Sequence, residues 1–310
     1  MRKIHLLVPC TARKTLDVST SMNISEHLSS DIQTTIENWE RAFSGTTSKT
    51  KAEDLYSGQA FSKLRTYSKE HDFSLKILSA GFGLVDGTTE LPGYNATFAQ
   101  NNNRVPTPRN DWWNTVTQSS LPSTSIKDTV KSHPQDNFVI VASNEYLQAI
   151  QVDLLEALSS SESAHERFAI VTTSIPKTLS AYASCFVKCS RKVLQHQNAK
   201  AFGLSLADRS ITTIATLMFL EKLALTKPDF SGTISALNNE FADLKEVQRP
   251  KKVSPYPEFI VHFIRREIDS VDRPTSSTSM LRKFRNSGYA CSAERFGEFY
   301  KQVKSEKGLS

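Results

Sequence analysis

The sequence predicts an α/β protein in which helices cover both faces of a mostly parallel sheet, a three-layer arrangement. Two observations predict the sheet: short, continuous apolar segments end at small polar residues, and helical patterns separate these segments. Such segments are typical of strands that are covered on both faces, and their alternation with helices favours parallel pairing. A third observation is that only helical patterns follow residue 200. We therefore expect an α/β domain over 1–200 and a helical domain over 201–310.

The expected strands are apolar runs that stop at Pro9, Ser79, Ser143 and Thr172, and they cover residues 4–8, 75–78, 138–142 and 168–171. Helical patterns lie between them at 55–69 and 146–158. The connection 87–137 is rich in Gly, Pro, Asn, Ser and Thr, with Trp112 and Trp113 as its main anchors. A connection of this length is usually functional or mobile.

The helical region has five expected helices, at 206–223, 231–247, 259–268, 277–286 and 293–303. Gly288 provides a stop between the last two. The final 61 residues hold 12 basic and 7 acidic side chains, and this excess of five accounts for most of the net charge of +6. Clustered cations on a terminal domain are typical of a polyanion-binding module. The alternative is an ordinary solvated basic face.

Several classes of protein are excluded or disfavoured. The longest purely apolar stretch is five residues, Phe138 to Ala142, whereas a bilayer span needs roughly 20. The apolar stretch before Pro9 is too short for a signal peptide. Four cysteines in 310 residues do not make a disulfide framework, so we expect a reducing cytoplasm. The motifs and residue clusters of metal sites and dinucleotide sites are missing, so we expect no metal and no cofactor.

Polar residues follow the expected strands, where an open parallel sheet binds its ligands. These residues include Cys10 and Thr11 after the first strand, Ser79 after the second, and Ser143, Asn144 and Tyr146 after the third. Thr11, Arg13 and Lys14 can present donors and cations to a phosphate, although the segment lacks the glycines of a P-loop. The alternative is an ordinary solvated loop.

The segment 77–86 carries Gly81 and Gly83 on either side of Phe82. Glycines allow a sharp turn and a close approach to a ligand, and Phe82 offers a flat face to a base. Tyr94 and Asn95 add a second aromatic ring and an amide for the edge of a heterocycle. The alternative is a glycine turn that packs core aromatics. Asp54 likewise has two interpretations, a catalytic carboxylate or a helix N-cap.

Three motifs together resemble the bacterial family related to the peroxide-stress DNA-binding protein, whose members often lie beside DNA-modification or phage-defence genes. The motifs are Cys10-Thr11-Ala12-Arg13-Lys14, Asp54-Leu55-Tyr56-Ser57-Gly58, and the segment 78–86 followed by Pro92-Gly93-Tyr94-Asn95. Residues 279–296 are similar to the helix-turn-helix tail of that family. The resemblance covers roughly 1–150 and 258–303.

Within that family, the resemblance implies an antiviral DNA glycosylase that excises glucosylated 5-hydroxymethylcytosine from T-even phage DNA and leaves abasic sites. The 1–200 domain would be catalytic and the 201–310 domain would bind phage DNA, with neither a membrane nor an obligate protein partner. The water-activating Gly-Gln-Asp-Pro-Tyr motif of uracil-DNA glycosylases is missing.

The expected roles follow from this activity. Catalysis falls to Asp54, Asp86 and Asn95, because a carboxylate stabilises an oxocarbenium-like sugar and orients water. Base binding falls to Ser79, Gly81, Phe82 and Tyr94 after the nucleotide leaves the stack. Phosphate contacts fall to Thr11, Arg13, Lys14, Arg282, Lys283 and Arg285. Simple hydrolysis is expected rather than attack by a lysine. The alternatives are a non-catalytic DNA-binding stress or regulatory protein and a base-exchange enzyme that acts on a modified purine.

Overall fold

The computed structural model describes residues 2–225, 229–245, 252–270 and 276–308. The chain forms two compact units, Met1–Glu246 and Val247–Ser310. Each unit has its own cluster of buried apolar side chains. The two units are therefore described separately.

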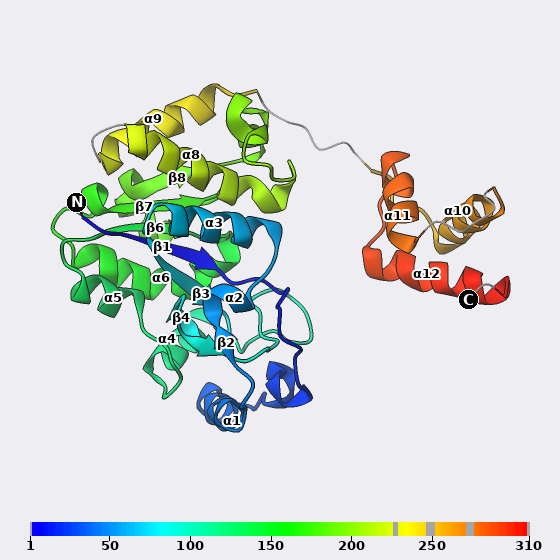
Figure 1. Ribbon diagram of the computed structural model, residues 1–310, viewed down its shortest axis with the longest axis horizontal. Helices are drawn as coiled ribbons and strands as arrows, with labels where there is room; N and C mark the ends of the chain where they lie inside the picture. The colour runs from blue at the N-terminus through cyan, green and yellow to red at the C-terminus, as the bar shows by residue number, and fades with distance from the viewer. Residues whose placement is uncertain (1, 226–228, 246–251, 271–275, 309–310) are drawn as a thin grey trace. The chain divides into compact units, whose positions relative to one another are not determined.

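The N-terminal unit is built around a six-stranded sheet with the strand order β4-β3-β1-β6-β7-β8 (Figure 1). Neighbouring strands pair in parallel except β3 and β4, which are antiparallel. The strands are β1 (Ile4–Pro9), β3 (Ser74–Ser79), β4 (Gly83–Asp86), β6 (Asn137–Val141), β7 (Phe168–Thr172) and β8 (Phe186–Lys188). A separate small sheet pairs β2 (Thr50–Lys51) with β5 (Glu90–Leu91). The four expected strands are confirmed, and β4 and β8 are additional.

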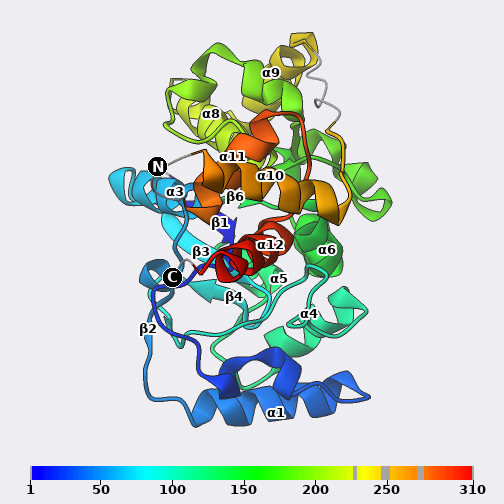
Figure 2. The ribbon, with the colours of Figure 1, turned by 90° about the vertical axis from the view of Figure 1, so that its right-hand side faces the viewer.

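Helices cover both faces of the large sheet (Figures 1 and 2). On one face lie α3 (Gln59–Glu70) and α8 (Ile211–Leu225), and on the other lie α4 (Arg109–Gln118), α5 (Ile126–Ser132) and α6 (Asn144–Ser159). Every residue of β6 and β7 is buried, as expected for strands that are covered on both sides. The predicted α/β fold with a mostly parallel sheet is confirmed.

The helix expected at 55–69 is divided into α2 (Ala52–Leu55) and α3, because the chain turns at Gly58 with a φ of 126°. Only glycine adopts such a conformation without strain. The long connection 87–137 contains β5, α4 and α5, and Trp112 and Trp113 of α4 are completely buried. Two further α-helices of this unit are α1 (Ile32–Ser44) and the short α7 (Ala164–Arg167). The 3-10 helices are η1 (Thr20–Met22), η2 (Ile24–Glu26), η3 (Lys177–Cys185), η4 (Arg191–Gln195), η5 (Gln197–Lys200) and η6 (Asp208–Ser210).

The boundary between the two units falls at 246/247 rather than at the expected 200/201. The reason is that α8 packs against β6 and β7, and α9 (Phe230–Asp243) packs against β7 and β8. Their apolar side chains therefore complete the core of the α/β unit. The helix expected at 231–247 ends earlier, at Asp243, and residues 246–247 lie outside the described residues.

The C-terminal unit consists of α10 (Pro257–Asp269), α11 (Ser277–Asn286) and α12 (Ala293–Glu306), close to the three helices predicted there. Its core is formed by apolar residues of all three helices, with Phe284 and Phe296 fully buried. The side chains of Ser276 and Ser292 cap the N-termini of α11 and α12. Among the described residues of the whole chain, no helix is long and apolar enough to cross a membrane.

Candidate active site

The candidate site lies at the carboxyl ends of β1 and β6. The chain adds β3 and β4 on one side of β1 and then returns to add β6, β7 and β8 on the other. The order of connection therefore reverses between β1 and β6, and open α/β sheets bind ligands at such a switch point. At this edge, Cys10 follows β1 and Tyr146 lies in the first turn of α6. The Cys10 Sγ and the Tyr146 hydroxyl are 3.1 Å apart.

A cavity of about 220 Å³ opens beside this pair. Its polar lining comes mainly from two loops, one after β1 and one after β5. The amides of Asn95, Asn101 and Asn103 contribute donors and acceptors, and the Tyr146 hydroxyl contributes another. The complete lining is Cys10, Thr11, Ala12, Lys14, Asn95, Ala96, Thr97, Asn101, Asn103 and Tyr146. We call this space the strand-end cavity.

Lys14 is the one charged side chain among the described residues that line the strand-end cavity. Its Nζ atom donates to the Thr11 carbonyl at 3.3 Å and lies 4.3 Å from the centre of the Tyr94 ring. Burial lowers the pKa of Lys14, while the nearby Cys10 opposes this shift. A lysine whose pKa is lowered by burial has a larger neutral fraction and is a better nucleophile.

Beneath Lys14 lies a buried chain of three hydroxyl groups. The Tyr94 hydroxyl is 2.8 Å from that of Tyr56 and 2.6 Å from the Ser79 Oγ. Burial raises the pKa of both tyrosines, so the phenols stay protonated. A Cβ atom on Gly81 would lie 2.8 Å from the Tyr94 ring, so the backbone at Gly81 fits closely against this ring. The hydrogen-bonded hydroxyls of Tyr56, Tyr94 and Ser79 therefore hold the Tyr94 ring, against which the Lys14 amine lies, in place; we call this network the rigid floor under Lys14.

A second, larger cavity of about 640 Å³ shares Cys10, Thr11 and Ala12 with the first and lies toward α3 and α8. Arg13 and Arg209 line it, together with Ser57 and Gly58 at the start of α3. Gly58 is the N-cap of α3 and offers no side-chain acceptor to the first N–H groups of the helix. The edge of the sheet thus has one small polar cavity and one larger cavity with cationic side chains.

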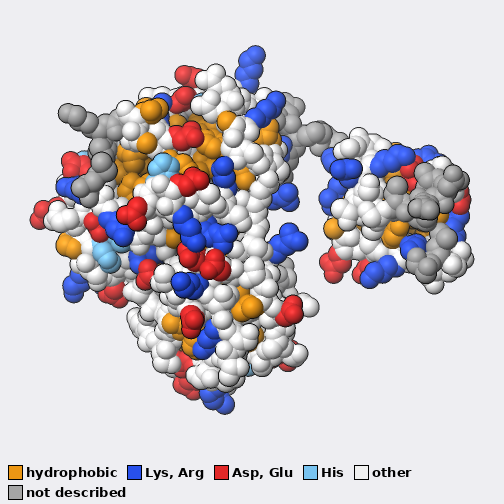
Figure 3. Space-filling model, viewed as in Figure 1, with side chains coloured by type: hydrophobic (Ala, Val, Ile, Leu, Met, Phe, Trp, Pro, Cys, Tyr) orange, Lys and Arg blue, Asp and Glu red, His pale blue; other side chains and the backbone are white. Residues whose placement is uncertain are grey.

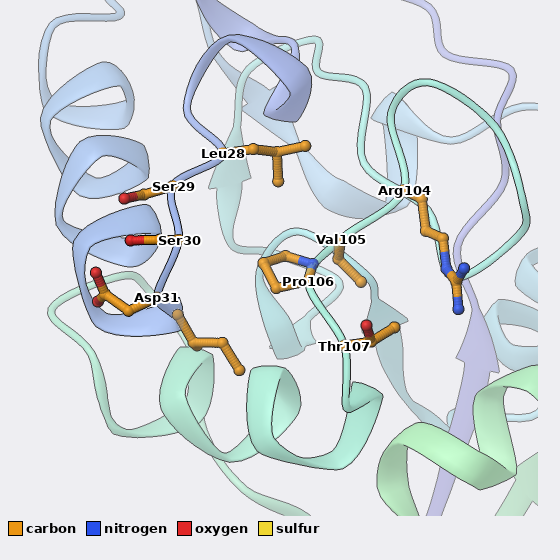
Figure 4. Close-up of a pocket in the computed structure, with 9 residues that line it drawn as sticks. Leu28, Ser29, Ser30, Asp31, Arg104, Val105, Pro106 and Thr107 are labelled. Atoms are coloured by element: carbon orange, nitrogen blue, oxygen red, sulfur yellow. The ribbon is translucent and has the colours of Figure 1, made fainter.

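A third hollow, of about 300 Å³, is lined by Leu28, Ser29, Ser30, Asp31, Ile32, Arg104, Val105, Pro106 and Thr107. Figure 4 shows Arg104 on the opposite side of this hollow from Ser29, Ser30 and Asp31. The Asp31 carboxylate accepts a hydrogen bond from the Thr34 N–H and caps α1. That hydrogen bond also holds the pKa of Asp31 below its ordinary value. The carboxylate is thus engaged as a helix cap, and none of the residues at the strand ends lines this hollow.

The structure does not bring the three expected catalytic residues together. The Asp54 carboxylate pairs with Arg65 at 3.2 Å, and the Asp86 carboxylate pairs with the Lys76 ammonium at 2.6 Å. Both carboxylates are about half exposed and line neither of the two cavities at the strand ends. The N-cap interpretation of Asp54 is also wrong, because Lys51 occupies that position of α2.

Asn95 is the member of that group that lines the strand-end cavity. Its Nδ2 donates to the Asn23 Oδ1 at 2.7 Å, and its backbone N–H and carbonyl bond to Met22 and Ile24. These contacts fix the amide in place. Asn95 can therefore position a ligand. It is not suited to the expected catalytic role, because an amide does not act as a general base.

The four expected base-binding residues lie under the cavity rather than in it. Phe82 is fully buried and packs against Trp39, Phe43 and Tyr94, so its face is not free to stack on a base. Ser79 accepts the backbone N–H of Phe82, and Gly81 accepts the Trp39 indole N–H through its carbonyl. Tyr94 is fully buried as well. The interpretation as a glycine turn with core aromatics is the one that the structure supports.

The loop residues expected to bind phosphate have different environments. The Thr11 hydroxyl donates within the chain to the carbonyls of Arg13 and Ser57. Arg13 is exposed at the larger cavity, whereas Lys14 is partly buried at the smaller one. Arg13 thus keeps the environment of a phosphate contact, and the environment of Lys14 lowers the pKa of its amine.

In the C-terminal unit, the three expected DNA contacts do not form one free cluster. Arg282 is exposed, Lys283 pairs with Glu267, and Arg285 donates to the Cys291 carbonyl. Arg285 instead lines a hollow of about 340 Å³ with Lys252 and Arg295, beside the N-terminus of α12. Figure 3 shows Lys and Arg side chains spread over the visible face of this unit. The cation-lined hollow is thus a stronger candidate for phosphate binding than the predicted helix cluster.

Sequence reasoning did not select Asn101, Asn103 or Tyr56 as site residues. The two asparagines lie in a polar connection with no strand signal, and only the fold brings them to the end of β1. The sequence indicates a site position for Tyr146, because this residue follows the end of an expected strand. Lys14 was selected, but its burial could not be predicted from its loop sequence.

The fold and the cavity together define a doubly wound α/β protein with a polar cavity at its switch point, the candidate ligand site. A comparison with protein-family models finds a match of residues 44–171, less than half of the chain, to a family of unknown function, DUF6884. The matched part includes α2, α3, β3, β4 and β6, but not the loop that carries Lys14. No curated protein and no solved structure matches the chain.

Proposed function

We propose that this protein is a DNA glycosylase that removes a modified base, and that Lys14 is its reactive group. The observation that carries the proposal is the strand-end cavity, whose lining combines one partly buried lysine with three asparagines and a tyrosine. Drug-sized ligands occupy roughly 300–1,000 Å³. A polar space of about 220 Å³ therefore suits one ring system, such as an extruded base.

The amides are suited to hold a base by its edge. Each of these three amides makes one hydrogen bond within the chain, through the Asn95 Nδ2, the Asn101 Oδ1 and the Asn103 Oδ1. Their remaining donor and acceptor capacity is of the kind that reads heterocycle edges. A base has to leave the stack to reach such a site, at a cost of a few kcal/mol. Hydrogen bonds inside the cavity and phosphate contacts outside it offset that cost.

The proposed reaction begins with the neutral Lys14 amine. Its nitrogen forms a bond to C1′ while the bond between C1′ and the base breaks, and the base leaves with that electron pair and takes up a proton. Burial raises the pKa of Tyr146 and makes it a weak acid, so this hydroxyl serves as a hydrogen-bond donor to the leaving base, and water supplies the proton. Opening of the sugar ring gives a protonated Schiff base. Water then hydrolyses it to an abasic sugar and restores the lysine.

This mechanism replaces the expected hydrolysis by Asp54 or Asp86. Each of these carboxylates pairs with a cation and lines neither strand-end space. A carboxylate stabilises an oxocarbenium-like sugar only when it lies close to C1′. Lys14, in contrast, lies in the wall of the space that suits the base.

DNA retention is assigned mainly to the C-terminal unit. Lys252, Arg285 and Arg295 surround the hollow at the N-terminus of α12, where a phosphate meets both side-chain cations and helix N–H groups. In the α/β unit, Arg13 and Arg209 line the larger cavity and are suited to phosphates that flank the extruded nucleotide. The resemblance described above narrows the base to glucosylated 5-hydroxymethylcytosine in phage DNA. The strand-end cavity of about 220 Å³ then takes the pyrimidine ring, and the glucose lies outside that cavity.

The test is to incubate the full chain with T-even phage DNA, with and without glucosylation. Abasic sites are revealed by alkali, and a Schiff base is trapped by borohydride as a covalent complex. We expect both products with glucosylated DNA and neither with Lys14→Gln, whereas the exposed Lys177→Gln control behaves as the wild type.

Other outcomes distinguish the alternatives. DNA retention without abasic sites on any modified DNA contradicts the glycosylase proposal and favours a non-catalytic DNA-binding protein. Incorporation of a labelled free base favours base exchange. Abasic sites without a trapped complex contradict the role of Lys14 and favour direct hydrolysis.

A further inference from the structure

A second group of chemically active side chains lies at the opposite end of β1. His5 is the second residue of this strand, Asp136 directly precedes β6, and His133 ends α5. Parallel pairing of β1 with β6 brings these segments together, because Ile4 faces Asn137 in the register. His5 and Asp136 are 131 residues apart in the sequence, so no local motif indicates their proximity.

The three side chains have the geometry of a ligand set. One imidazole nitrogen from each histidine and one Asp136 oxygen all lie within 4.8 Å of one another. The His5 Nε2 is 3.0 Å from the Asp136 Oδ2, and the centres of the two imidazole rings are 4.5 Å apart. Zinc ligands lie about 2.0–2.2 Å from the ion, so neighbouring ligands in a tetrahedral site are roughly 3.4 Å apart. The two ligand atoms that are farthest apart therefore have to approach each other by only a little more than 1 Å to bind one ion.

The hydrogen bonds of the two histidines indicate which ring nitrogen of each carries the proton. The His133 Nδ1 lies 2.9 Å from the Thr129 carbonyl, which can only accept, so Nδ1 carries the proton and Nε2 carries a lone pair. A backbone carbonyl in this position is the usual outer partner of a metal-bound histidine. His5 is 2% exposed, and its Nε2 donates to the Asp136 carboxylate. An ion bound to this Nε2 replaces that hydrogen bond and moves the ring proton to Nδ1, which is buried without a partner among the described residues. Such an unpartnered nitrogen is unusual in a folded protein.

Surrounding contacts hold the two ligand-bearing segments in place. The Arg167 guanidinium donates to the backbone carbonyls of both Asp136 and His133, at 3.0 Å each. The Lys3 N–H donates to the second Asp136 oxygen at 3.2 Å. The Asp136 side chain is 23% exposed, which gives an ion and a water molecule access from solvent.

From this geometry we infer that His5, His133 and Asp136 form a binding site for a divalent first-row transition metal, of which Zn²⁺ is the type. Two imidazoles and one carboxylate are ligands that Zn²⁺ accepts, and water completes a tetrahedral set. The site is structural, because it lies at the other end of β1 from the strand-end cavity and ties β1 to the connection between α5 and β6. It is independent of the proposed glycosylase activity.

The test uses the full chain after removal of metals by a chelator and dialysis. Isothermal titration with ZnCl₂ gives the stoichiometry, and the visible spectrum with Co²⁺ reports tetrahedral coordination. We expect one equivalent of Zn²⁺ and a rise in the melting temperature on its addition. Asp136→Asn and His133→Gln should each weaken binding at least tenfold, the effect reported for disturbed metal shells.

His165→Gln is the matched control, because His165 is a half-exposed histidine in α7 that belongs to no such group. Circular dichroism establishes that each variant is folded. Absence of saturable binding to the wild type overturns the inference, and so does equal binding by the wild type and both folded variants. Neither outcome depends on base release, so failure of this site and failure of the proposed activity are distinguishable.

Discussion

The two units differ in the environment that they give to their cationic side chains. The α/β unit places one lysine, Lys14, in a small polar cavity where burial lowers its pKa. The C-terminal unit gathers Lys252, Arg285 and Arg295 around an open hollow. A lysine whose pKa is lowered by burial has a larger neutral fraction and is a better nucleophile, whereas clustered cations attract phosphates. This difference fits the proposed division of labour, in which the α/β unit releases the base and the C-terminal unit binds DNA.

The largest expected effect is on the pH dependence of base release. Because burial lowers the pKa of Lys14, the neutral amine increases as pH rises and becomes dominant above that pKa. The single-turnover rate should therefore rise roughly tenfold per pH unit below the pKa and then reach a plateau. DNA retention by the C-terminal arginines should not follow this curve. A single-turnover rate that falls as pH rises contradicts a lysine nucleophile.

The next largest effect is expected on DNA binding by the C-terminal unit. Lys252→Ala combined with Arg295→Ala should weaken DNA binding about tenfold and lower the slope of log affinity against log salt by about 1.8, the value for two phosphate contacts. Base release at saturating DNA should stay within about twofold. The control is Lys131→Ala with Lys177→Ala, two exposed lysines of the α/β unit. An unchanged salt slope in the test variant places the DNA contacts elsewhere.

A smaller effect is expected on stability. Tyr94→Phe removes the hydroxyl that joins Tyr56 to Ser79 and leaves two buried groups short of a partner. The free energy of unfolding should fall by about 1–3 kcal/mol, measured by urea denaturation. Tyr256→Phe, at a side chain that is 83% exposed in the C-terminal unit, should have no measurable effect. Equal stability of both variants is inconsistent with a rigid floor under Lys14.

The smallest effect is expected for the two carboxylates. Asp54→Asn and Asp86→Asn should each change the rate of base release less than about threefold, because neither carboxylate lines a cavity at the strand ends. The Lys76 partner of Asp86 is buried, so the Asp86 variant is first shown to be folded. Abasic sites are counted after alkali treatment, with the wild type measured in parallel. A loss of a hundredfold or more in either variant restores that carboxylate as the catalytic group.

Much of the fold was predictable because continuous apolar runs reveal strands that are buried on both faces. Ile4 to Val8 and Phe138 to Ala142 are such runs, and both became central strands. β4 was missed because it follows β3 after a turn at Gly81 and Phe82, so its four residues read as part of a loop. β8 is only three residues long and pairs on one side.

The site was less predictable than the fold, because burial depends on contacts between distant segments. Phe82 sits between glycines, a local pattern that fits both a ligand platform and a core turn, and packing against Trp39 and Tyr94 decides between them. Asp54 and Asp86 are close in sequence to site segments, but Arg65 and Lys76 hold them outside the cavities. Asn101 and Asn103 carry no sequence signal for their position.

The separate core of the C-terminal unit has a thermodynamic consequence. Because α10, α11 and α12 bury Phe284, Phe296 and their neighbours among themselves, melting of this bundle does not require melting of the sheet. A calorimetric scan should therefore resolve two heat-absorption peaks of unequal size. The smaller belongs to the three-helix bundle, whose limited size allows only modest cooperativity.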